Sequence, residues 1–176
     1  MAGRIHFTPT EADMVAATRD WFRRDLLRPR VRLALFGAPL AAAALGVALA
    51  LQAGAPSGRA FWLGGVWALG GFALVVLIFA LRYAALPGAA RRNFWQNKAL
   101  QAEHVFSWSE EALSWESAVA NARILWADLH RWGEGPGAFL FAVSERGVQF
   151  VPRRALSDEQ AADLRATALR HGPARL

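Results

Sequence analysis

The chain has 176 residues, is 55% hydrophobic, contains no cysteine and carries a formal net charge of +6. The lack of cysteine excludes disulfides and thiolate metal sites, and the length leaves room for one small domain beside a membrane segment. A net charge of this size would favour nucleic acid as the partner of a soluble protein, but two long apolar stretches explain it better, so we expect contact with membrane lipids and no nucleic acid.

The first 32 residues predict a strand and a helix. Ile5 and Phe7 alternate with polar residues, which is typical of a short strand over Arg4–Thr8. Because an unpaired strand tends to be covered, we expect this strand to join the sheet predicted near the other end of the chain. A threonine, a proline and a glutamate at positions 8, 9 and 11 then indicate the start of a helix.

This helix is amphipathic on a wheel of 3.6 residues per turn. The apolar arc contains Met14, Val15, Thr18, Trp21, Phe22 and Leu26. The opposite arc contains Asp13, Asp20, Arg23 and Arg24, and Asp25 falls within the apolar arc. Such a helix either lies at a membrane interface or packs on a soluble domain, and we favour packing on the domain.

Two uncharged stretches follow, one between Arg32 and Arg59 and one between Arg59 and Arg82. Each exceeds the roughly 20 apolar residues that cross about 30 Å of hydrocarbon. We interpret 33–51 and 60–81 as the two helices of a transmembrane hairpin over residues 33–81. A cleaved signal peptide is not expected, since the first stretch is too long for its apolar region and begins after 32 residues.

Basic residues flank the hairpin asymmetrically. Six precede it and four follow it: Arg19, Arg23, Arg24, Arg28, Arg30, Arg32, and then Arg82, Arg91, Arg92 and Lys98. The connection between the two stretches offers only Arg59. The positive-inside rule therefore predicts a multi-pass membrane protein with both termini in the cytoplasm and residues 52–59 outside.

Small residues predict how the two spans pack. One stripe is formed by Ala42, Gly46 and Ala50, and the other by Gly64, Ala68 and Gly71. Lipid provides no hydrophobic drive between helices, so stripes that allow close backbone approach usually mark the contact. Neither span contains an ionisable residue, which disfavours a transporter or channel.

After the hairpin, Pro87-Gly88 predicts a break, and residues 82–102 are interpreted as a juxtamembrane helix. From Glu103 the period changes to two, which predicts antiparallel strands over His104–Trp108, Leu113–Ser117, Arg123–Trp126, Leu129–Trp132, Phe139–Val143 and Val148–Val151. A last helix opens at Ser157, where Gln160 completes a capping box. Its apolar face is expected to contain Ala161, Leu164, Ala168 and Leu169. The predicted fold class is membrane α + β, with a β domain over 103–176.

Three segments of this chain resemble the YcxB-like family of small bacterial membrane proteins. Leu113-Ser114-Trp115-Glu116 is similar to a strand after an acidic turn, and Trp126-Ala127-Asp128-Leu129 to the family's W-[SA]-D-[IL] step. Residues 151–156, which Ser157-Asp158-Glu159 follow, resemble an I-P-[KR]-R-[AT]-F segment before the closing helix, with Arg for the usual Lys and Leu for Phe. The resemblance implies a short N-terminal segment, two spans and a pleckstrin-homology-like C-terminal domain. It implies no catalytic residue.

Sites for catalysis, metals or cofactors are not indicated. The four histidines, at positions 6, 104, 130 and 171, lack the spacing of helical metal ligands. Residues 133–138 match G-x-G-x-x-A, but they lie between two strands, where glycines serve a turn and not a dinucleotide. We therefore expect no catalytic, cofactor-binding or metal-binding residues.

Four tryptophans lie on successive predicted strands: Trp108, Trp115, Trp126 and Trp132. Aromatic residues in such an arrangement could stack on single-stranded nucleic acid. A small sheet, however, needs bulky side chains to fill its core, and we favour this interpretation.

Arg153 and Arg154 form the sharpest candidate site, for an anionic lipid headgroup or a partner. The alternative, which we favour, is a solvated strand end. Our functional hypothesis is a non-enzymatic inner-membrane protein whose cytoplasmic domain contacts a lipid or an unidentified protein. The alternatives are a membrane-bound enzyme with an unrecognised site and, third, an accessory subunit of a transporter.

Overall fold

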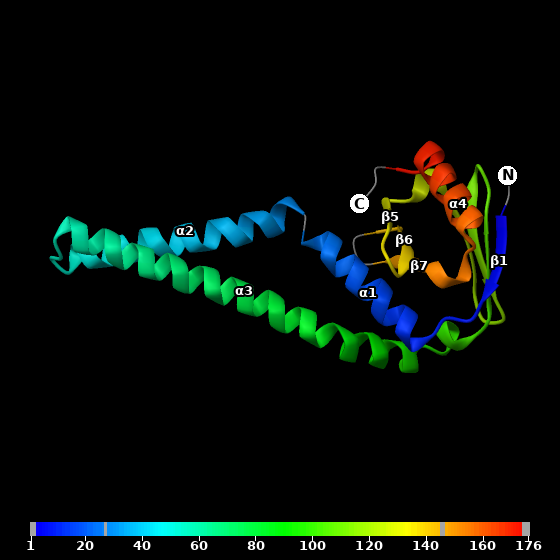
Figure 1. The fold of residues 1–176 in the computed structure, drawn as a ribbon, viewed down its shortest axis with the longest axis horizontal. Helices are drawn as coiled ribbons and strands as arrows, with labels where there is room; N and C mark the ends of the chain where they lie inside the picture. The colour runs from blue at the N-terminus through cyan, green and yellow to red at the C-terminus, as the bar shows by residue number, and fades with distance from the viewer. Residues whose placement is uncertain (1–2, 27, 145–146, 174–176) are drawn as a thin grey trace. The chain divides into compact units, whose positions relative to one another are not determined.

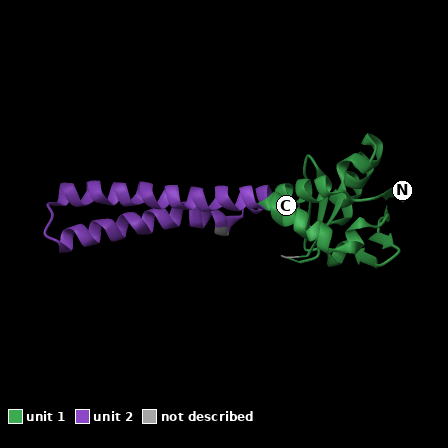
Figure 2. Ribbon diagram, turned by 90° about the horizontal axis from the view of Figure 1, so that it is seen from below, with its two compact units in different colours: residues 1–21, 86–176 green, residues 22–85 purple. Residues whose placement is uncertain are grey.

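The computed structural model describes residues 3–26, 28–144 and 147–173. The chain forms two compact units (Figure 2). Unit 1 contains Met1–Trp21 and Leu86–Leu176, and unit 2 contains Phe22–Ala85. Unit 1 therefore combines segments that precede and follow unit 2 in the sequence.

Unit 2 is built on two helices, α2 (Pro29–Gln52) and α3 (Ser57–Gln96), and α3 continues beyond the unit. Both are long and apolar enough, by length and composition, to cross a membrane: Val31–Gln52 within α2 and Ser57–Gln96. The predicted spans lie within these helices. The turn between them contains Gly54 with φ of +78°, a left-handed conformation that glycine adopts without a steric penalty.

Glycines lie where α2 and α3 contact each other. A Cβ atom on Gly46 would come within 2.7 Å of the Trp67 side chain, and one on Gly64 within 2.5 Å of Val47. A Cβ atom on Gly71 would lie 3.1 Å from that of Ala42. Larger side chains from the opposite helix therefore occupy the space at Gly46 and Gly64. Of the other stripe residues, Ala50 is buried and Ala68 is half-buried.

The predicted helix break at Pro87-Gly88 is wrong, because α3 continues through both residues to Gln96. A short 3-10 helix, η1 (Lys98–Gln101), follows it. A proline inside a helix costs about 3 kcal/mol. Contacts after the proline offset this cost: Ala90 and Phe94 are buried, and two polar contacts with Glu11 hold the same segment.

Glu11, at the start of helix α1 (Glu11–Asp25), binds the end of α3. Arg91 Nε lies 2.7 Å from Glu11 Oε1, and Trp95 Nε1 donates to Glu11 Oε2 at 3.1 Å. These contacts involve side chains from both sides of the hairpin sequence. The residues next to Pro87-Gly88 in the sequence give no sign of these contacts, so they could not predict that the helix continues.

Unit 1 contains two antiparallel sheets and a C-terminal helix (Figure 1). The first sheet has the order β1-β2-β3-β4, with bounds Gly3–Phe7, His104–Trp108, Ala112–Ser117 and Asn121–Leu125. The second has the order β5-β6-β7, with bounds Arg131–Glu134, Ala138–Ala142 and Val148–Pro152. The 3-10 helices η2 (Trp126–Asp128) and η3 (Arg153–Ala155) and the helix α4 (Asp158–His171) complete the unit.

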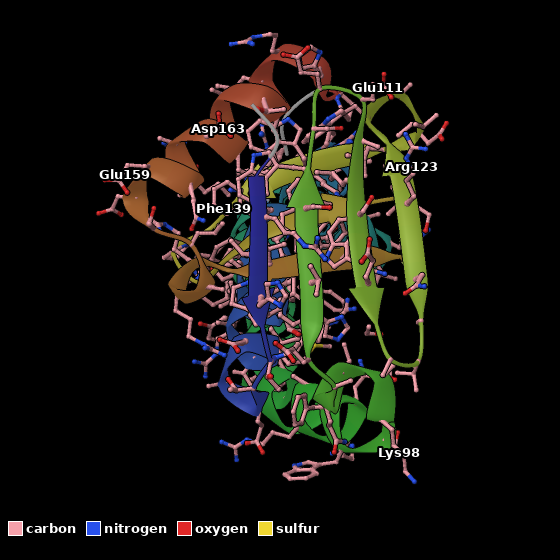
Figure 3. All side chains as sticks on the ribbon, turned by 90° about the vertical axis from the view of Figure 1, so that its right-hand side faces the viewer. Lys98, Glu111, Arg123, Phe139, Glu159 and Asp163 are labelled. Carbon is pink, nitrogen blue, oxygen red and sulfur yellow. The ribbon has the colours of Figure 1, made fainter. Side chains whose placement is uncertain are left out.

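Strand β1 pairs with β2 from Gly3 opposite Trp108 to Phe7 opposite His104. This pairing confirms the prediction that the N-terminal strand joins the sheet. In Figure 3 the four strands lie side by side, with β1 nearest to α4 and Arg123 on the far strand, β4.

The core of unit 1 lies between the two sheets and α4. Ile5 and Phe7 pack there with aromatic residues of the other strands. All four strand-region tryptophans are buried in this cluster, at 1 to 5% exposure, which confirms that they form a core: Trp108, Trp115, Trp126 and Trp132. Trp108 Nε1 donates to Asp163 of α4 at 2.8 Å, so the indole keeps a polar partner although it is buried.

The capping box at Ser157 and Gln160 is present, as predicted. The buried face of α4 contains Thr167 in place of Leu169, which is 60% exposed. The Thr167 hydroxyl donates to the Asp163 carbonyl at 2.9 Å. That hydrogen bond removes the penalty of burying an unpaired hydroxyl, which is why a polar residue can occupy the packed face.

Packing of α2 on α3 can be tested with Gly46→Leu, which we expect to lower the free energy of unfolding by about 1–3 kcal/mol, because the new side chain overlaps Trp67. Gly65→Leu is the matched control, since a Cβ atom there meets nothing within 4 Å. Thermal unfolding of the full chain in detergent measures both. An equal loss in the two variants would contradict the assigned contact.

Candidate interaction site on unit 1

Helix α1 packs on unit 1 through its polar arc. Its buried residues are Asp13, Ala17 and Asp20, which stand on one face of the helix. The preference for packing on the domain is confirmed, and the buried face includes two aspartates. Two carboxylates can be buried here because each finds a donor on the β domain.

Asp13 accepts two hydrogen bonds from Arg154, which follows β7. Arg154 Nε lies 2.8 Å from Asp13 Oδ1, and Arg154 Nη2 lies 2.6 Å from Asp13 Oδ2. The same guanidinium also donates to the Thr8 carbonyl at 3.0 Å. A bidentate pair of this kind fixes geometry as well as charge. Arg154 therefore fastens the start of α1 to the end of the three-stranded sheet.

Asp20 fixes the middle of α1 at the β5–β6 connection. Its carboxylate accepts a hydrogen bond from the Gly137 amide at 3.0 Å. A Cβ atom on Gly135 would lie 2.1 Å from the Asp20 carboxylate, and one on Gly137 would lie 2.7 Å from Ala16 Cβ. The glycines of 133–138 therefore serve the close approach of α1 as well as the connection between two strands.

Arg153 also has an acidic neighbour. Its Nη2 atom lies 2.5 Å from Asp158 Oδ1, and its Nη1 atom donates to the Leu156 carbonyl at 3.0 Å. The two arginines of the candidate anion site thus each face an aspartate. Their positive charge is offset locally, which weakens the attraction that a lipid phosphate would feel at this pair. The lipid hypothesis for Arg153 and Arg154 stays a prediction.

The apolar arc of α1 remains half-buried and lines an open groove of about 230 Å³, named here the α1 groove. Its walls come from α1, α3, β6 and β7: Met14, Ala17, Thr18, Trp21, Asn93, Leu140, Val148 and Phe150. Thr18 donates its hydroxyl to the Met14 carbonyl at 2.7 Å. The groove therefore offers mainly carbon surface with the Asn93 amide at one wall, an arrangement suited to an apolar side chain or chain segment.

Sequence patterns reveal only one wall of this groove. Met14, Thr18 and Trp21 were visible as an arc of one helix. Their partners lie 72 to 136 residues later in the chain (Trp21 to Asn93, and Met14 to Phe150), and only the packing of unit 1 brings them together. Among residues 3–26, 28–144 and 147–173, no group of three His, Asp or Glu side chains is placed to hold a metal ion.

The contact between Asp13 and Arg154 can be tested by substitution. Arg154→Gln should lower the free energy of unfolding by about 1.5–3 kcal/mol, since it leaves a buried carboxylate without its charged donor. Arg123→Gln is the matched control, because Arg123 meets Glu111 at 3.5 Å in an exposed pair, worth at most about 1 kcal/mol. Denaturation of the full chain in detergent compares the two. Equal losses would mean that Arg154 has no special role.

The same contact predicts a pH dependence. Burial raises the pKa of Asp13, but hydrogen bonds from Arg154 and Thr10 outweigh it, so the pKa lies below its ordinary value. The contact between Asp13 and Arg154 therefore stabilises the fold fully at pH values above about 3.9, the pKa of an unfolded aspartate. This stabilisation is lost as the pH falls through the lower pKa that Asp13 has in the folded protein. The stability difference between the parent and Asp13→Asn should be constant above about pH 5 and shrink below about pH 4.

Comparison with known proteins gives one match. Residues 108–168 match the family model described as YcxB-like protein. No curated protein and no solved structure matches the chain. The matched range begins at the end of β2 and ends within α4, so it covers most of both sheets but neither α1 nor the apolar helices. Residues 108–168 are therefore similar to the YcxB-like family, as the sequence resemblance predicted.

Proposed function

We propose that this protein is a non-enzymatic integral protein of the bacterial inner membrane whose cytoplasmic, pleckstrin-homology-like domain binds a protein or lipid partner. The YcxB-like match and the two apolar helices support the general assignment. The arrangement of four and three antiparallel strands with a C-terminal helix supports the pleckstrin-homology-like fold. The α1 groove is the surface to which we assign the binding.

The groove is a better candidate than the arginine pair for a physical reason. Arg153 and Arg154 already face Asp158 and Asp13. In the groove, by contrast, Val148 and Phe150 remain half-buried next to Trp21. Burial of such apolar surface by a partner contributes about 25 cal/mol per Å². We therefore assign binding to the groove and favour a partner that presents an apolar segment.

The pairing of β1 with β2 supports the proposed topology. The two strands lie on opposite sides of the apolar helices in the sequence, yet they form one sheet. Two segments can share a folded domain only if they lie on the same side of the membrane, which requires an even number of crossings. A hairpin of two spans meets this condition, and the arginine bias then favours the cytoplasmic side.

Reporter fusions test this topology. A reporter inserted at residue 56, in the turn between α2 and α3, should report the outside, and one at the C-terminus should report the cytoplasm. The reason is that the basic residues flanking the apolar helices resist translocation. Reporters that give the same side at both positions would exclude a membrane-spanning hairpin.

Site-specific photocrosslinking in intact membranes tests the groove. A benzophenone side chain at Val148 should give a discrete adduct of protein or lipid mass, because this position lines the groove. The same group at Val119, which is 65% exposed in the turn between β3 and β4, is the control. The adduct should disappear in a Trp21→Ala background that still folds. Equal labelling at both positions, or no effect of Trp21→Ala, would contradict binding in the groove.

A further inference from the structure

We infer that unit 2 contains a binding site for an anionic phospholipid, with an acyl chain in an apolar cleft and the phosphate on Arg23 and Arg82. This site is separate from the α1 groove, since all of its residues belong to Phe22–Ala85. The inference does not depend on what unit 1 binds. It rests on a cleft, on an aromatic cluster at its wall and on the charges beside it.

The cleft is lined by residues at the end of α1, in the first turns of α2 and in the middle of α3, away from the turn that connects α2 and α3. Its volume is about 380 Å³. The lining side chains are almost entirely carbon: Phe22, Leu26, Leu35, Val76, Phe79 and Tyr83. An apolar cavity of this kind is poorly hydrated and accepts apolar ligands. Because the cleft lies on the candidate spans, a lipid acyl chain is the apolar ligand present in greatest amount.

Phe22 forms one wall of the cleft. Its ring centroid lies 6.4 Å from that of Phe79 and 5.8 Å from that of Tyr83, both in tilted arrangements. These distances are within the range of favourable aromatic pairs. The Phe22 side chain thus fixes one wall of the cleft against α3. Arg23, the next residue, is thereby held beside the same surface.

Arg23 and Arg82 place positive charge beside the cleft. Arg23 Nη2 lies 3.5 Å from the Tyr83 hydroxyl, which is part of the cleft wall. Arg82 is exposed and follows Phe79 by three residues, so the two are neighbours on the helix surface. The arginine fork matches the geometry of a phosphate group. An acyl chain in the cleft would therefore bring its own phosphate to these two residues.

The charge of unit 2 favours an anion over a neutral lipid. Residues 22–85 contain seven arginines and a single acidic residue, Asp25, which lies 3.0 Å from Arg28. Six of the arginines lie at the cleft end of the helices in the sequence, and only Arg59, in the first turn of α3, lies near the connecting turn. A basic site between membrane helices on this side is suited to an anionic headgroup. A free phosphate ion would leave the apolar cleft unused, so the matching ligand is an amphiphile.

Native mass spectrometry of the full chain tests the site. The purified protein is exposed to equal amounts of phosphatidylglycerol and phosphatidylcholine that carry the same acyl chains. The parent should retain phosphatidylglycerol in preference to phosphatidylcholine. Arg23→Gln with Arg82→Gln should reduce this preference about fivefold per arginine removed. Ala80→Phe, which fills the cleft, should reduce retention of both lipids.

Two matched variants serve as controls. Arg59→Gln removes one arginine at the other end of the hairpin, and Ala73→Phe adds the same ring at an exposed position of α3. Neither should change lipid retention. If Arg59→Gln reduced the preference as much per arginine, net charge would be the cause and the inference would be wrong. If Ala73→Phe acted like Ala80→Phe, the assignment of the cleft would be wrong.

Circular dichroism melting of each variant distinguishes loss of lipid from loss of fold. If Ala80→Phe does not fold, the arginine variants still decide, since exposed substitutions leave the core intact. Equal retention of both lipids by the parent would overturn the inference. The inference would also be overturned if lipid retention survived Arg23→Gln with Arg82→Gln but was lost in Arg153→Gln. That result would place the lipid on unit 1 and would not contradict the proposed function.

Discussion

The pairing of β1 with β2 is the constraint on which the rest of unit 1 depends. It places Ile5 and Phe7 in the aromatic core and brings α1 to the three-stranded sheet. Without β1, the β2 strand would expose an unpaired edge and one side of the core would open to water. The YcxB-like range of 108–168 therefore describes only part of the folding unit. The remainder comes from residues that precede the apolar helices.

The docking of α1 shows how polar residues can form an interface between a helix and a sheet. Asp13 and Asp20 are both buried, yet one is paired with Arg154 and the other accepts a backbone amide. Each contact has a direction, so together they fix the rotation of the helix about its axis. This rotation leaves the apolar arc facing the α1 groove. A helix held only by apolar contacts would have turned that arc inward.

Local patterns predicted the parts of the fold that local interactions determine. Alternation located all the strands, and β2 was placed at its observed bounds of His104–Trp108. The capping box of α4 and the glycines between α2 and α3 were likewise visible in short sequence windows. Each depends on residues within a few positions of one another, or on a periodicity that one helix or strand carries by itself.

The features that local patterns missed also share a cause. The break expected at Pro87 was wrong, and the burial of Asp13 and Asp20 was not predicted, because partners distant in the sequence decide both. Glu11 contacts Arg91 and Trp95, and Asp13 contacts Arg154, across intervals of 80 residues or more. The α1 groove was missed for the same reason. No periodicity in one segment can show which distant segment will cover it.

The position of β1 in the sequence also has a consequence for biosynthesis. Phe7 leaves the ribosome 97 residues before His104, its partner in the sheet. At about 5–20 residues per second, the strand waits about 5–20 s for that partner, during which both apolar helices are made. Unit 1 therefore cannot close before the hairpin has been synthesised. Its N-terminal strand must remain soluble and unpaired for this time, which its short length and its polar residues Arg4 and His6 favour.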